Sequence, residues 1–128
     1  MLTVSGQSVL GKWKTIDDKT GNPRSIVTIY EEGGKLFGNI TELIDPDEPN
    51  PVCDECKDER KGQPILGLQI IRNLVKDGKA YAKGKILDPE NGKEYKCKIW
   101  IDPENTDKLN VRGYIAFLYR TQVWHRFK

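Results

Sequence analysis

Apolar and polar side chains alternate with a period of two along most of this chain, and the alternation predicts β-strands. Segment 95–101 shows it most clearly, because Tyr95, Cys97, Ile99 and Ile101 alternate there with Lys96, Lys98 and Trp100. Segment 109–115 repeats the pattern after a turn at 102–107. This period is typical of a strand that buries one face and exposes the other.

Eight strands are predicted in this way, joined mostly by short turns rich in Gly, Asn, Asp and Pro. Their approximate bounds are 12–16, 24–32, 35–44, 67–75, 79–87, 95–101, 109–115 and 119–127. Antiparallel strands in chain order most simply close into a barrel, because closure leaves no unpaired strand edge. We therefore expect an all-β fold, an eight-stranded antiparallel up-and-down barrel, with a two-sheet sandwich as the alternative.

Length and charge limit the organisation and the partners. The 128 residues suit one domain. We expect a single barrel domain over 11–128, with a long Cys-containing loop at 45–63, after a disordered or added segment at 1–10. The 21 basic and 19 acidic residues leave a net charge of +2, which creates no global field for nucleic acid or a membrane. No apolar run approaches the roughly eighteen residues of a transmembrane segment.

The side chains on the expected inner face are uneven in size. Small residues there are Gly38, Ala80, Ala82, Gly84, Cys97 and Gly113. An eight-stranded barrel has room inside for packed side chains or for one small ligand. Small inward residues favour a cavity, and aromatic rings from neighbouring strands that fill the space are the alternative.

The Cys53-x-x-Cys56 pair lies in the loop, where the alternation stops. A redox role is disfavoured because the intervening Asp54 and Glu55 oppose thiolate formation. A structural zinc site normally needs a second close pair of ligands, and the sequence offers none. A disulfide between Cys53 and Cys56 is favoured, and it would place the protein outside the cytosol. Cys97 is expected to be a small buried hydrophobe, although a bridge from it to the loop stays open.

Catalytic and metal-binding patterns are absent from the sequence. The one histidine, His125, has no sequence neighbour suited to pair with it, and the acidic residues of 45–59 lack the spacing of a calcium loop. We expect no enzyme activity, cofactor or metal. A series of lysines on two neighbouring strands is interpreted as a solvated face, with a site for an anionic partner as the alternative: Lys79, Lys83, Lys85, Lys96 and Lys98.

The two ends of the barrel sequence resemble the calycin group, which includes the lipocalins and fatty-acid-binding proteins. The resemblance is carried by Gly11-Lys12-Trp13 on the first strand and by an arginine on the last. It implies that these strands pair and that a guanidinium covers the indole of Trp13, a cation–π contact that closes the barrel. Arg126 and Arg120 are the two candidates for that guanidinium.

A longer series of motifs is similar to the bacterial domain-of-unknown-function family 2147 over residues 11–126. The motifs are Gly11-Lys12-Trp13, 17–21, 29–30, 34–40, Cys53 with Cys56, 64–68, 86–98, 109–114 and 120–124. The resemblance implies an exported mature chain without an established activity, and a signal peptide that has been removed. Lys83 and Tyr119 depart from the family pattern, where glycine is expected.

Together these features predict a non-catalytic, lipocalin-like barrel, periplasmic or secreted, that binds a small, partly apolar or amphipathic ligand. Candidate lining residues are Phe37, Tyr81, Trp100, Arg112, Tyr114 and Trp124. No nucleic-acid partner is expected. The alternative is a protein-interaction module of the bacterial envelope whose barrel is filled with side chains and which captures a partner through its acidic Cys-containing loop or an exposed aromatic patch.

Overall fold

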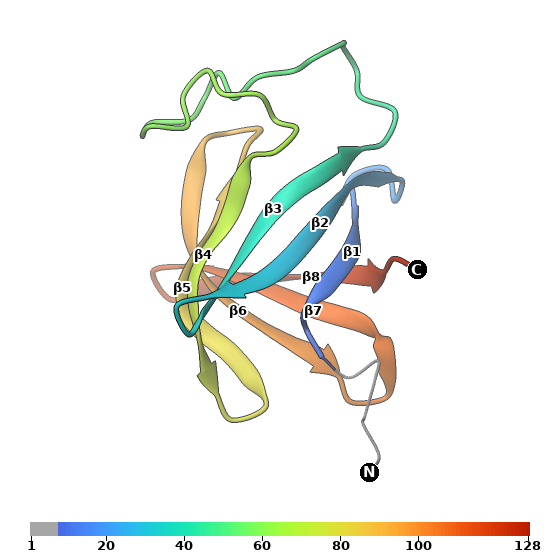
Figure 1. Ribbon diagram of the computed structural model, residues 1–128, viewed down its shortest axis with the longest axis vertical. Helices are drawn as coiled ribbons and strands as arrows, with labels where there is room; N and C mark the ends of the chain where they lie inside the picture. Colours follow the sequence, from blue (N-terminus) through green and yellow to red (C-terminus); the bar gives the residue numbers. More distant parts are fainter. Residues whose placement is uncertain (1–7) are drawn as a thin grey trace.

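The computed structural model describes residues 8–128, and within them eight strands and no helix are present (Figure 1). The strands are β1 (Gly11–Ile16), β2 (Pro23–Glu32), β3 (Lys35–Leu43), β4 (Gln69–Asp77), β5 (Ala80–Asp88), β6 (Lys93–Asp102), β7 (Asn105–Ile115) and β8 (Leu118–Arg126). Of the expected N-terminal segment, residues 1–7 lie outside the described range, whereas Val9 is buried.

The strands form one closed barrel in chain order, and every neighbouring pair is antiparallel. Closure occurs where β1 meets β8, through the register pairs Trp13↔Arg126 and Lys14↔His125. The backbone N–H of Phe127 extends this seam by donating to the carbonyl of Lys12 at 3.0 Å. The predicted up-and-down barrel is thus confirmed, and the two-sheet alternative is wrong because no strand edge remains to divide the sheet.

One end of the barrel is packed with apolar side chains, and we call it the closed end. The turns β2–β3, β4–β5 and β6–β7 lie here, together with the beginning of β1. The buried side chains that fill it are Val9, Trp13, Val27, Ile29, Leu36, Ile71, Leu74, Ile99 and Leu109. Val27 and Ile29 belong to this cluster, so the inner face of β2, ambiguous from sequence, is the face that carries them.

Two inward glycines lie where neighbouring strands approach each other closely. A Cβ atom at Gly38 would lie 3.2 Å from Ile71. At Gly84 it would overlap the backbone carbonyl of Arg72, because β5 passes directly over β4 where both strands deviate from regular geometry (φ of Asn73 is 63° and of Lys83 is 65°). These glycines therefore lie where neighbouring chain occupies the space, and they do not create a cavity.

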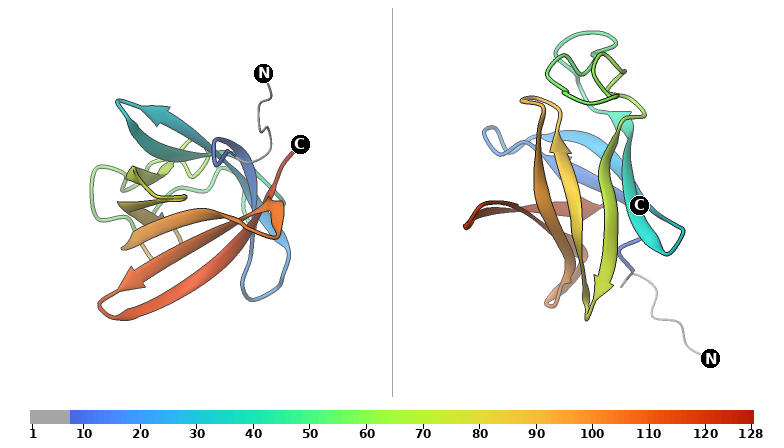
Figure 2. Two further views of the ribbon diagram at one scale, coloured as in Figure 1. Left: turned by 90° about the horizontal axis from the view of Figure 1, so that it is seen from below. Right: turned by 90° about the vertical axis from the view of Figure 1, so that its left-hand side faces the viewer.

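The opposite end, which we call the open end, carries the turns β1–β2, β5–β6 and β7–β8 and the long connection between β3 and β4. This connection, residues 44–68, is the Cys loop; it extends beyond the strands at the top of Figure 1 and lies beside the β5–β6 turn in the right-hand view of Figure 2. It folds back on itself through an isolated bridge between Val52 and Pro64. The open end is where the barrel interior is accessible.

Candidate functional site

A cavity of about 750 Å³ occupies the open end. Apolar side chains from six strands and from the Cys loop line it. They are Ile16, Ile40, Leu43, Ile65, Ile70, Ile86, Leu87, Val111, Ile115, Leu118 and Trp124. Charged and polar side chains gather at its rim: Thr15, Asp17, Asp18, Lys19, Arg24, Asp88, Glu90, Asn91, Tyr95, Tyr119, Arg120 and Gln122. The cavity thus has an apolar wall and a polar mouth, the usual composition of a small-molecule site.

Alternate residues of β8 connect the wall to the mouth through hydrogen bonds. The buried indole of Trp124 donates from Nε1 to Oε1 of Gln122 at 3.1 Å, and Gln122 donates from Nε2 to Asp18 at 2.8 Å. Arg120 forms an ion pair with the same Asp18 carboxylate at 3.2 Å. This series of hydrogen bonds gives Nε1 of the buried indole an acceptor and holds the β1–β2 turn beside β8.

A second set of charges lies across the mouth. Arg24 on β2 forms ion pairs with Asp17 at 3.3 Å and with Glu90 in the β5–β6 turn. Asp88, partly buried at the end of β5, has its pKa raised above the usual value by desolvation, an effect that the nearby positive charge of Arg24 only partly offsets. Asp88 is therefore a carboxyl group of the cavity whose charged form is less favourable than that of an exposed carboxylate.

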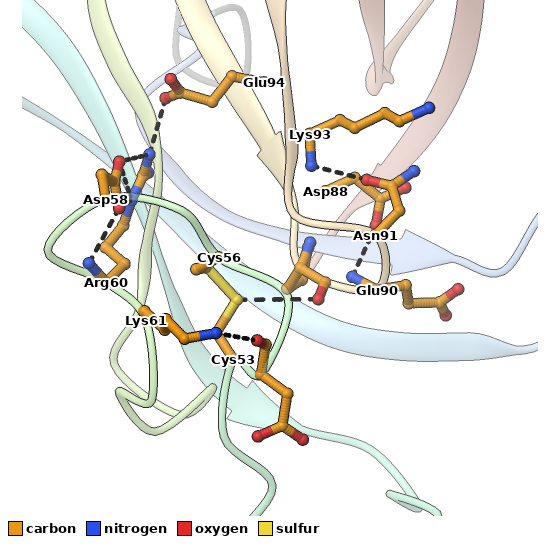
Figure 3. The surroundings of a disulfide bond; sticks show 12 residues. Cys53, Cys56, Asp58, Arg60, Lys61, Asp88, Glu90, Asn91, Lys93 and Glu94 are labelled. Carbon is orange, nitrogen blue, oxygen red and sulfur yellow. Dashed lines mark hydrogen bonds and ion pairs between the residues drawn. A yellow bond between two sulfur atoms is a disulfide. The ribbon is translucent and has the colours of Figure 1, made fainter.

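The Cys loop contains a buried disulfide that packs beside the β5–β6 turn (Figure 3). Cys53 and Cys56 are bonded and fully buried, which confirms the predicted pairing. Sγ of Cys53 lies 3.8 Å from the carbonyl oxygen of Pro89. Gly92 passes so close to the loop that a Cβ atom there would overlap the carbonyl oxygen of Glu55. Loop and turn therefore form one packed unit beside the cavity.

Arg60 gives this unit a polar anchor, although only 4% of its side chain is exposed. Its guanidinium contacts Asp58 at 2.6 Å and Glu94 at 2.7 Å, and Nη1 donates to the carbonyl of Gln69 at 2.8 Å. Figure 3 shows Arg60 between the two carboxylates. The hydrogen bonds from Arg60 lower the pKa of Asp58 to about 2. The buried charge is thus compensated by acids from the loop and from β6.

Of the six predicted lining residues, only Trp124 lines the cavity. Phe37 stacks on Tyr30 with ring centroids 5.9 Å apart, and Tyr81 lies beneath Lys76. Trp100 and Tyr114 lie on the outer face with Arg112, whose guanidinium is 5.0 Å from the Trp100 ring. Phe37, Trp100, Arg112 and Tyr114 alternate with the inward residues of their own strands, and side-chain chemistry does not change that parity. Tyr81 is on the inner face, where it pairs with Ile99 and packs against the core, but it lies at the closed end and not in the cavity.

The two candidate arginines of the barrel clasp lie at opposite ends of β8. Arg126 covers Trp13 at the closed end, with its guanidinium carbon 4.3 Å from the ring centroid. Arg120 lies at the mouth of the cavity, 74% exposed and paired with Asp18. The structure therefore places Arg126 in the position that the calycin resemblance implies, and it places Arg120 elsewhere.

The remaining titratable candidates do not join the site. Cys97 is a free, buried thiol, and desolvation raises its pKa to about 12. It forms no bridge to the loop, since Cys53 and Cys56 are bonded to each other. Within residues 8–128 there is no group of three or more His, Cys, Asp and Glu side chains that could hold a metal ion. No helix in the same range is long and apolar enough to cross a membrane.

Sequence reasoning missed several residues of the site. Gln122, Arg120 and Leu118 could have been found from Trp124 by counting back in steps of two along the last strand. Asp88 ends β5 and Asn91 lies in the turn that follows, where no periodicity predicts direction. Arg60 is one basic residue in an acidic loop, and its partner Glu94 is 34 residues away, so nothing local marks it as buried.

Comparison with known proteins agrees with the fold. Residues 11–126 match the model of the family described as "Uncharacterized protein conserved in bacteria" (DUF2147), and the chain belongs to that family. No curated protein matches the chain significantly. A solved structure, the protein HP1028 from the human pathogen Helicobacter pylori, described as belonging to the lipocalin family, superposes with a TM-score of 0.80 over 95% of this chain and 84% of that chain. At 16% identity the likeness shows a lipocalin-like fold.

Proposed function

We propose that this member of the DUF2147 family is a non-enzymatic carrier that holds a small, partly apolar molecule in the open-end cavity. The observation that carries the proposal is the cavity itself. Its volume of about 750 Å³ falls within the range that ligand sites of proteins commonly have. A barrel that served only as a rigid scaffold would gain stability by filling this space with side chains.

The lining supports a ligand with an apolar body and a polar end. Ile70, Ile86 and Val111 offer a hydrocarbon surface inside the barrel. At the mouth, Asp88 and Gln122 offer acceptors and donors. We infer that the apolar part of the ligand lies against the wall while its polar group lies between these two side chains.

The buried disulfide supports a location outside the cytosol. Disulfides persist in oxidising compartments and are rare where thiols are kept reduced. Cys53 and Cys56 are fully buried, and their bond closes a short ring within the loop. We infer that the mature protein works in the periplasm or is secreted.

The alternative, an interaction module acting through the Cys loop, has one observation in its favour. Leu66 and Val52, both in that loop, are exposed apolar side chains. The alternative also expects a barrel filled with side chains, however, and the open-end cavity supports the carrier instead.

A fluorescent fatty-acid analogue, dansylaminoundecanoic acid, tests the carrier function. Ile86→Phe extends a ring from the wall into the cavity, whereas Val123→Phe adds the same ring on the outer face of β8. We expect the wild type and Val123→Phe to bind the probe equally and Ile86→Phe to bind about tenfold more weakly, since the lost contact area is that of several methylene groups.

Protein recovered from a bacterial periplasm provides an independent measurement. Native mass spectrometry is expected to show a bound small molecule that is lost in Ile86→Phe. Equal probe binding by both phenylalanine variants, with an empty cavity in the recovered protein, contradicts the proposal. Thermal melting of each variant verifies that the barrel remains folded, because overpacking alone costs about 1–3 kcal/mol.

A further inference from the structure

The hairpin that joins β7 and β8 ends in apolar side chains that face solvent. Ile115 and Leu118 form the last register pair, and Phe117, in the turn between them, is 89% exposed. Figure 2 shows this hairpin extending away from the barrel at the open end. Runs of exposed apolar residues are avoided in folded proteins unless they have a function.

The turn itself departs from ordinary hairpin chemistry. Two-residue hairpin turns favour Asn or Gly because the chain adopts positive φ there. Here the two residues are Ala116, with a φ of 53°, and Phe117. Strained backbone and an exposed aromatic ring at one tip point to a function for the tip and not to a role in folding.

The outer face next to the tip is basic and aromatic. Strand register places Lys85 opposite Lys96, Lys96 opposite Tyr114, and Tyr114 opposite Tyr119, in one row that crosses four strands and ends at the hairpin. The adjoining row pairs Lys98 with Arg112. We call the surface formed by these two rows the basic face.

Acidic residues are absent from the strand segments that form this face. All 19 Asp and Glu residues precede Lys108, and none occurs in 79–87 or 95–101. The small net charge of the chain therefore hides a strong asymmetry. On β5, β6 and β7 the acids Asp88, Glu94, Asp102 and Asp107 lie near the strand ends, while the middle of these strands carries cations without interleaved acids.

We propose that the basic face and the hairpin tip dock the protein on a bilayer that carries anionic phospholipid. Lysine and arginine attract the headgroups, tyrosine and tryptophan suit the interface, and the Phe117 ring enters the acyl boundary. A lipid surface fits better than a nucleic acid, because an isolated apolar tip has no counterpart on a phosphate backbone. The docking does not depend on a ligand in the cavity, although Ile115 and Leu118 belong to both surfaces.

Vesicle co-sedimentation tests the proposal, with phosphatidylcholine alone and phosphatidylcholine mixed with phosphatidylglycerol. The wild type is expected to bind only the anionic vesicles, and less tightly at high salt. Lys96→Gln with Lys98→Gln should weaken binding about 25-fold, at about fivefold for each cation near the surface. Phe117→Ser should weaken it about tenfold.

Matched controls distinguish a loss of binding at the basic face from the effect of a lower net charge or of one fewer exposed phenylalanine. Lys12→Gln with Lys35→Gln makes the same change in net charge at the closed end, and Phe127→Ser removes an exposed phenylalanine outside the tip. Both controls should bind like the wild type. The proposal is overturned if the protein binds no vesicle, or if the controls weaken binding as much as the face variants. It is also overturned if the protein binds a single-stranded oligonucleotide through these lysines and does not bind vesicles. Thermal melting confirms that all variants fold.

Discussion

The guanidinium of Arg126 covers the indole ring of Trp13, its central carbon 4.3 Å from the ring centroid. Its Nη2 also donates to the carbonyl of Thr106 at 2.9 Å and to that of Ser8 at 3.2 Å, and it pairs with Asp107. One side chain thus joins the residues before β1, the strand β7 and the strand β8. The seam between β1 and β8 has only two register pairs, so this clasp supplements few backbone hydrogen bonds.

Replacing Arg126 by Met is expected to lower the free energy of unfolding by about 2–3 kcal/mol, because a cation–π contact and several charge-assisted hydrogen bonds are lost together. Urea unfolding measures the change. Arg120→Met is the matched control: its ion pair is exposed, and the cost should stay below about 1 kcal/mol. Equal losses of unfolding free energy in Arg126→Met and Arg120→Met would show that the clasp stabilises the barrel no more than an exposed ion pair does.

Arg60 anchors the Cys loop, and Arg60→Met leaves Glu94 and the carbonyl of Gln69 without their partner. We expect a loss of about 2 kcal/mol, less than for a fully buried pair because the acids are partly exposed. Hydrogen exchange should accelerate in residues 44–68 and not in β7. Arg72→Met, which removes a more exposed pair with Glu59 of the same loop, is the comparison and should accelerate loop exchange less than Arg60→Met.

Acid should loosen the same contact. The folded-state pKa of Asp58, about 2, lies below its ordinary value of 3.8, so its stabilising effect is complete above the unfolded value and is lost as the pH falls toward 2. Loop amide protection should decrease through this range. In Asp58→Asn the protection of the loop amides should be lower at neutral pH and should depend less on pH. A loop whose protection is constant from pH 5 to about 2 is incompatible with this linkage.

Gly92→Ala is expected to detach the Cys loop from the β5–β6 turn. A methyl group would overlap the carbonyl of Glu55, and the φ of 72° disfavours any side chain. The combined cost should be about 2 kcal/mol or more. Gly33→Ala is the control, since its φ of 60° carries similar strain with nothing within 4 Å. Comparable losses in the two variants would mean that backbone strain alone, without the loop contact, explains the effect.

Asp88→Asn should raise the melting temperature at neutral pH. Burial raises the pKa of Asp88, so its charged form opposes folding once the pH exceeds the folded-state value, and the amide lacks that charge. The gain should shrink as the pH falls to the unfolded value. Asp17→Asn should act in the opposite direction, because hydrogen bonds from the backbone of Thr20 and Lys19 lower the pKa of Asp17. Melting curves at several pH values distinguish the two signs.

The fold was accessible from sequence because each strand carries its own signal. The period of two along β6 and β7 identifies inner and outer faces directly, and short turns leave little freedom in strand order. The bulged positions were not visible. Between Tyr81 and Gly84 the register of β5 with β6 shifts, and the sequence shows only a lysine before a glycine.

The site was less accessible because its geometry depends on contacts between distant segments. The cavity exists at the open end because the closed end takes the larger core side chains, and the Cys loop is placed by Gly92 and Glu94. Aromatic residues were predicted to be ligand contacts, but Trp100 and Tyr114 follow strand parity and point outward. Parity applied without regard to side-chain chemistry would have selected Gln122 and Val111.

The clasp between Arg126 and the carbonyl of Ser8 brings the first and last described parts of the chain side by side at the closed end. A tag or further domain attached at Ser8 or after Lys128 would therefore emerge opposite the cavity mouth and leave it unobstructed. The same proximity allows a circular permutant in which a short linker joins the ends and new termini open in the β2–β3 turn. In such a permutant the seam between β1 and β8 becomes an ordinary hairpin, covalently protected where the natural barrel is closed only by side chains and a few hydrogen bonds.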